Sequence, residues 1–107
     1  METVYILGTA RTPMGGLQGV FADVPASQLG GVAIAAAIEV AQVAPEQVDE
    51  LLMGCVLPAG QGQAPARQAG FAAGLGEKVP ATTVNKMCGS GMKTTMMGYD
   101  QLALGRD

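Results

Sequence analysis

The sequence predicts an α/β fold in which helices lie tightly on a sheet with parallel strands. Short apolar runs alternate with longer stretches of helical spacing, in the order β-α-β-α-β-α. This alternation is typical of a parallel sheet with right-handed crossovers. Alanine supplies much of the apolar content, and the 107 residues include only two Phe, two Tyr and no Trp. Such a composition favours closely packed helices over a core anchored by aromatic side chains.

The first predicted elements are a strand and a long helix. Residues 4–7 form a continuous apolar run with β-branched and aromatic members, which suits a strand buried on both faces. After a long polar loop, Ser27 is the expected N-cap of a helix over about residues 28–42. Gly30 and Gly31 should let this helix approach the sheet closely.

The middle of the chain predicts a short helix, a second strand and a further helix. Pro45 should begin a short helix, and residues 51–57 should form a buried strand. A glycine-rich loop over residues 58–63 follows. Pro65 then stands where a helix can start, and Gly74 where that helix should end.

The last part predicts a strand over residues 82–85 and a helix over residues 89–104, capped by Gly105. One face of this helix carries mostly large apolar side chains, which we expect to pack in the core: Met92, Met96, Tyr99 and Leu102 or Ala103. The chain stops where a further strand would be expected. Residues 1–107 therefore read as part of a truncated domain.

Charge and hydropathy exclude several classes of function. The net charge is −3 without a basic stripe, so we expect no nucleic-acid partner. The longest apolar stretch, residues 32–38, is too short to span a bilayer. Two cysteines do not make a disulfide scaffold, and the N-terminus lacks a basic leader region, so a cytoplasmic location is expected.

Cys88 is the candidate nucleophile because it stands between a predicted strand and a predicted helix. A helix N-terminus presents unpaired N–H groups and a partial positive charge, which favour thiolate over thiol. The same groups, including the backbone N–H of Cys88, can hold an oxyanion when a thioester carbonyl is attacked. Neighbouring glycines permit a sharp turn and leave room for an acyl group.

Other polar residues have simpler interpretations. Cys55 lies mid-strand and reads as a small buried apolar residue. Lys86 and Lys93 flank the candidate nucleophile but fit solvated surface groups better than a site for an anionic ligand. The loop over residues 61–68 lacks the pattern of a nucleotide-binding loop, which favours a structural role.

Four segments in order resemble the N-terminal motifs of thiolases: residues 8–15, 48–54, 60–69 and 85–92. The resemblance covers essentially the whole chain and is strongest around Cys88. It implies a layered α/β fold, with residues 1–107 forming the N-terminal half-domain and contributing β-α-β-α-β-α to a mixed sheet with helices on both faces.

The resemblance also implies a reaction and partners. Cys88 would attack an acyl-CoA or 3-ketoacyl-CoA, become an acyl-thioester, and pass the acyl group to a second acyl-CoA or to CoA. Coenzyme A esters are then substrates, with no separate cofactor and no metal. Thiolases are dimers or tetramers, and residues 82–86 would lie near the two-fold axis.

The chain departs from the thiolase pattern in two ways. It has no His, and it lacks the later histidine and second-cysteine motifs, so the 107 residues alone should be inactive and of marginal stability. Ala64 also stands where many thiolases have Asn. Two alternatives stay open: a related condensing enzyme, such as a ketoacyl synthase or hydroxymethylglutaryl-CoA synthase, or a non-catalytic structural fragment.

Overall fold

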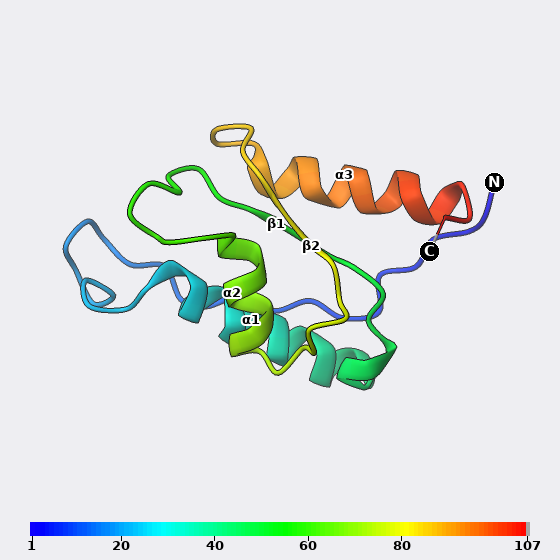
Figure 1. The fold of residues 1–107 in the computed structure, drawn as a ribbon, viewed down its shortest axis with the longest axis horizontal. Coiled ribbons are helices and arrows are strands. Elements are labelled where there is room, and N and C mark those ends of the chain that lie inside the picture. The colour runs from blue at the N-terminus through cyan, green and yellow to red at the C-terminus, as the bar shows by residue number, and fades with distance from the viewer. Residues whose placement is uncertain (107) are drawn as a thin grey trace.

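The computed structural model describes residues 1–106 and contains a two-stranded parallel sheet between layers of helices (Figure 1). Helix α3 lies over one face of the sheet, while α2 packs on the other face with α1 behind it. The elements in chain order are α1 (Ala26–Ala41), the 3-10 helix η1 (Pro45–Gln47), β1 (Leu51–Gly54), α2 (Pro65–Ala72), β2 (Ala81–Val84) and α3 (Ser90–Ala103). The predicted α/β class and helices on both faces are confirmed.

Strands β1 and β2 run parallel and are joined by α2, as the alternating pattern predicts. Their register pairs Leu51 with Ala81 at one end and Gly54 with Val84 at the other. Both strands therefore end at the same edge of the sheet. The chain leaves this edge through a long loop into α2 and a short turn into α3 (Figure 1).

Helix α1 packs closely on α2. A Cβ atom added at Gly31 would lie 2.6 Å from the Cβ atom of Ala72, and one at Gly30 would lie 3.1 Å from that of Ala69. At Gly31 the contact leaves no room for a side chain, and at Gly30 the neighbouring atoms would have to give by a few tenths of an ångström. The predicted close packing is thus present, mainly against a neighbouring helix, and Gly30 also lies close to the sheet, because its added Cβ atom would be 3.3 Å from the Cε atom of Met53 in β1.

The prediction that Ser27 caps α1 is wrong. The helix begins at Ala26, and the N-cap position belongs to Pro25, whose φ of −60° and ψ of 144° are extended. The carbonyl of Pro25 accepts hydrogen bonds from the N–H groups of Gln28 and Leu29. Ser27 consequently lies inside the first turn and makes no capping hydrogen bond.

The predicted strand over residues 4–7 is also absent from the sheet. Within residues 1–106, β1 and β2 pair only with each other, so this segment has no ladder to join. Tyr5, Ile6 and Leu7 are 73%, 81% and 64% exposed. The N-terminal end is held instead by a hydrogen bond from the N–H of Glu2 to the carbonyl of Ala103 (3.0 Å).

The large apolar side chains of α3 are exposed, contrary to the prediction that they form core, and of the two alternatives for the last position Ala103 is buried while Leu102 is exposed. Met92, Met96 and Tyr99 are 73%, 54% and 49% exposed, because the opposite face of α3, with Ser90 and Thr94, packs on the sheet. Among the described residues, the buried apolar side chains are few and mostly alanine: Ala66, Ala69, Leu75 and Ala103. No helix among residues 1–106 is long and apolar enough to cross a membrane.

Candidate active site

Cys88 lies in the turn that connects β2 to α3, at the sheet edge where both strands end. Its side chain is exposed, and α3 begins two residues later at Ser90. Within residues 1–106, the backbone N–H of Cys88 donates no hydrogen bond to a protein acceptor. The predicted placement of an accessible thiol and a free N–H group at a helix start is therefore present.

The sharp turn before Cys88 depends on a methionine, not on the glycines that the sequence suggested. Met87 has a φ of 47°, in the left-handed region that residues with a side chain rarely adopt. This conformation costs about 1–2 kcal/mol for an L-residue. Gly89 has a φ of −96°, and a Cβ atom at Gly91 would meet nothing within 4 Å. The glycines thus leave space near the sulfur.

Hydrogen bonds from two side chains hold this turn. Asn85 Oδ1 accepts from the N–H of Met87 (2.9 Å), and Asn85 Nδ2 donates to the carbonyl of Val56 (3.1 Å). The hydroxyl of Ser90 donates to the carbonyl of Met87 (2.6 Å) and accepts from the N–H of Lys86 (2.9 Å). Ser90 is 3% exposed, so its two bonds are partly shielded from solvent, whereas those of Asn85 are exposed.

The start of α3 also rests directly against the end of β1. A Cβ atom added at Gly54 would lie 2.8 Å from the backbone N of Gly91 and from the C and Cβ atoms of Ser90. Real Cβ atoms essentially never approach other atoms so closely. The missing side chain of Gly54 therefore sets how near the helix N-terminus comes to the sheet.

Comparison with known proteins identifies the family. Residues 4–107 match the family model described as the N-terminal domain of thiolase. The chain belongs to the thiolase family. It is 51% identical over 105 residues to an acetyl-CoA acetyltransferase of Cupriavidus necator, covering 98% of this chain and 27% of that protein. It is 52% identical over 102 residues to acetyl-CoA acetyltransferase 2 of Arabidopsis thaliana, covering 95% and 25%.

A solved structure agrees with these sequence matches. The Acat5 thiolase from Ascaris suum, crystallised in complex with coenzyme A, superposes with a TM-score of 0.92 at 33% identity. The match covers 95% of this chain and 27% of that one. The thiolase fold that the motifs implied is thus confirmed, and the chain spans about a quarter of the length of its relatives.

The second cysteine of this thiolase chain lies outside the strand in which it was predicted. Strand β1 ends at Gly54, so Cys55 follows the strand and is only half-buried. Its sulfur is 3.5 Å from the Nε2 atom of Gln61, which also donates to the carbonyl of Leu57 (2.6 Å). Cys55 therefore packs under the loop after β1, beside a pocket that the first residues of α1 and α2 also line.

The loop before α2 is folded by its own amide groups, which supports the structural interpretation of this motif. Gln68 Nε2 donates to the carbonyls of Gln61 (2.8 Å) and Gln63 (2.7 Å). Ala64, where many thiolases have Asn, adopts a left-handed conformation with a φ of 49°. The N–H of Ala66 in the first turn of α2 donates to the hydroxyl of Thr83 in β2 (3.0 Å).

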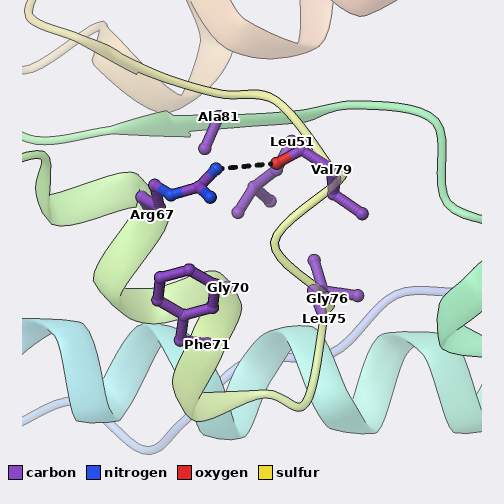
Figure 2. Close-up of a pocket in the computed structure, with 8 residues that line it drawn as sticks. All are labelled: Leu51, Arg67, Gly70, Phe71, Leu75, Gly76, Val79 and Ala81. Carbon is purple, nitrogen blue, oxygen red and sulfur yellow. Dashed lines mark hydrogen bonds between the residues drawn. The ribbon is translucent and has the colours of Figure 1, made fainter.

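Arg67, in the first turn of α2, reaches the segment that leads into β2 and has a structural role (Figure 2). Its guanidinium donates to the carbonyls of Val79 (3.3 Å) and Glu77 (2.8 Å) and lies 4.7 Å from the centre of the Phe71 ring. These contacts tie α2 to the chain that leads into β2. The surrounding cavity is mostly apolar and contains no nucleophile.

Sequence reasoning missed the residues that shape the turn carrying Cys88. Asn85 directly follows a strand and precedes a turn, where an Asn side chain commonly accepts from the N–H two residues later, and this signal could have singled it out. Gly54 offered no comparable sign, because its role depends on a contact with the start of α3, far away in the sequence. The Ser90 hydroxyl bonds to residues three and four positions earlier, but the sequence reasoning gave it no role.

Proposed function

We propose that this chain is the N-terminal part of an acetyl-CoA acetyltransferase in which Cys88 accepts the acyl group. The observation that supports this most is an exposed thiol beside a free backbone N–H at the start of α3. The relatives named acetyl-CoA acetyltransferase, about half identical over nearly the whole chain, favour acetyl-CoA as the substrate.

The first half-reaction is acyl transfer to sulfur. The Cys88 thiolate attacks the thioester carbonyl, forming a new carbon–sulfur bond and a tetrahedral oxyanion. The N–H of Cys88 donates to this oxyanion, and the partial positive charge of the helix N-terminus stabilises it further. The oxyanion then collapses, the bond to the sulfur of coenzyme A breaks, and coenzyme A leaves with the proton that Cys88 gave up.

The second half-reaction returns the thiol. The carbanion of a second acetyl-CoA attacks the acyl-cysteine carbonyl to give acetoacetyl-CoA, and the Cys88 thiolate leaves. In the reverse direction, coenzyme A takes the acyl group. Because this chain has no His, the proposal assigns the base that moves these protons to another part of the enzyme. The 107 residues alone should therefore not catalyse turnover.

The exposed apolar surface supports the proposal that these residues act within a larger assembly. The accessible surface is 7555 Å², whereas a globular protein of this mass typically exposes about 5,500 Å². We propose that other parts of the enzyme cover Met92, Met96 and Tyr99, and that the free edge of β2 pairs with a second copy in a homodimer or homotetramer. Sedimentation of the full-length protein as a monomer would contradict the second statement.

The proposed reaction needs no cofactor, because the acyl group is activated by its own thioester and stored on Cys88. Coenzyme A and its esters are the partners. Two cysteines without a disulfide fit a reducing compartment, and we propose a cytoplasmic location. Fractionation of the source cells with an antibody against the protein would test this.

The proposal is tested by competition between the two thiols of the full-length protein. With limiting iodoacetamide, Cys88 should be alkylated before Cys55, and acetyl-CoA should protect it. Cys88→Ser should abolish acyl transfer while keeping the fold, since the two side chains are nearly isosteric. Cys55→Ser is the matched control and should retain activity. Equal alkylation of both thiols, or no protection, would contradict the nucleophile assignment.

A further inference from the structure

We infer that Asn85 and Ser90 are positioning residues that fix the strained turn before Cys88 and so aim its sulfur and its N–H at the substrate carbonyl. The inference rests on the proposed function, because it concerns the same nucleophile. Neither side chain needs to touch the substrate. Each acts through the backbone of the two residues that precede Cys88.

The turn needs restraint because Met87 adopts a conformation that an unrestrained chain would leave. Its φ of 47° lies in the left-handed region, which is strained for a residue that has a side chain. Rotation of Met87 toward an ordinary conformation would swing the next residue, Cys88, away from the start of α3. The geometry of the nucleophile therefore depends on whatever holds Met87.

Asn85 is suited to this because both ends of its amide are used. Its oxygen accepts from the N–H of Met87 at 2.9 Å, and its nitrogen donates to the carbonyl of Val56 at 3.1 Å. Val56 belongs to the segment after β1, which lies 29 residues earlier in the sequence. The amide thus joins the nucleophile turn to the neighbouring part of the sheet edge.

Ser90 restrains the same turn from the helix side. Its hydroxyl accepts from the N–H of Lys86 at 2.9 Å and donates to the carbonyl of Met87 at 2.6 Å. At 3% exposure, the hydroxyl has little access to water that could replace these bonds. The carbonyl of Met87 also accepts from the N–H of Ser90 at 3.1 Å.

These bonds occupy the polar backbone groups around Met87 and leave the N–H of Cys88 without a protein acceptor. That is the arrangement an oxyanion donor requires, because the donor must be aimed before the charge develops. A misplacement of about 1 Å at a reacting group can lower a rate roughly 100-fold. Loss of a restraint should therefore lower kcat and leave substrate KM nearly unchanged.

The experiment measures kcat, KM and the rate of acyl-enzyme formation in the full-length enzyme. Asn85→Ala, at an exposed position, should fold and lower the acylation rate about 10- to 100-fold with little change in KM. Asn85→Asp keeps an acceptor for the N–H of Met87 and should retain more activity than Asn85→Ala. Ser90→Ala should show the same selective loss of kcat.

Thr95→Ala is the matched control. It removes a hydroxyl-to-carbonyl hydrogen bond of 3.0 Å to Gly91, on the same helix but outside the turn, and should leave kcat unchanged. If the wild type is active and the Asn85→Ala variant is equally active, this inference alone is contradicted. Equal losses of activity in Asn85→Asp and Asn85→Ala would contradict it as well. A wild type that forms no acyl-enzyme at Cys88 would contradict the proposed function, and the inference with it.

Discussion

Replacing Gly54 by Ala should push the start of α3 away from β1 and weaken both stability and catalysis. The added Cβ atom would lie 2.8 Å from the backbone N of Gly91, and ordinary contact begins at 3.4 Å. The two elements must therefore separate by about 0.6 Å. Because backbone atoms cannot rotate out of the way as a flexible side chain can, we expect a cost of about 1–3 kcal/mol.

The sign of this effect makes the test informative. Gly→Ala usually stabilises a protein by about 0.4–1 kcal/mol where the backbone can accept it, because the unfolded chain has fewer conformations. Gly98→Ala is such a case, because Gly98 lies in the middle of α3 and its added Cβ atom would be in ordinary contact, 3.9 Å from the Cδ1 atom of Leu52. The two substitutions should therefore change the free energy of unfolding in opposite directions.

The assay is denaturant unfolding of the full-length protein together with the alkylation rate of Cys88. Gly54→Ala should lower both the unfolding free energy and that rate, while Gly98→Ala should raise the former and leave the latter unchanged. The reasoning would be refuted if Gly54→Ala were as stable as the wild type and alkylated equally fast, because the close contact between β1 and α3 could not then exist.

Three further substitutions test contacts around α2, each measured by denaturant unfolding. Ala64→Asn should raise stability by about 1 kcal/mol, because Asn tolerates the left-handed conformation at a φ of 49°; a loss would contradict the strain. Thr83→Val should cost about 1–3 kcal/mol by leaving the buried N–H of Ala66 unpaired, and an unchanged midpoint would show that this bond contributes nothing. Arg67→Lys should lower stability, because lysine lacks the planar group that donates to two carbonyls at once and stacks on Phe71, and it should leave the alkylation rate of Cys88 unchanged.

Local patterns in the sequence predicted the elements that position Cys88, the proposed nucleophile. Pro65 begins α2 as expected, and α3 begins at Ser90, one residue inside the predicted helix. These signals are local, since proline at the first helical turn and glycine near a helix start act through the backbone of neighbouring residues. The placement of Cys88 between strand and helix follows from the same patterns.

Predictions of burial were wrong where they depended on which other segment of the protein covers an apolar side chain. The apolar runs at Tyr5 and along Met92 and Met96 read as core, yet these side chains are exposed within residues 1–106. Hydropathy indicates that a residue favours burial, but it does not indicate which segment covers that residue. The strain at Met87 escaped notice because no sequence pattern marks a methionine as left-handed.

The most direct test of the central claim is to find the acyl group itself. The full-length enzyme should be mixed with acetyl-CoA, quenched in acid and digested, and its peptides compared by mass spectrometry. The proposal predicts one acetyl group on the peptide that contains Cys88, removable by hydroxylamine as a thioester should be, and none on the peptide that contains Cys55. Acetylation of Cys55 instead, or no hydroxylamine-sensitive acetyl group on Cys88, would contradict the claim.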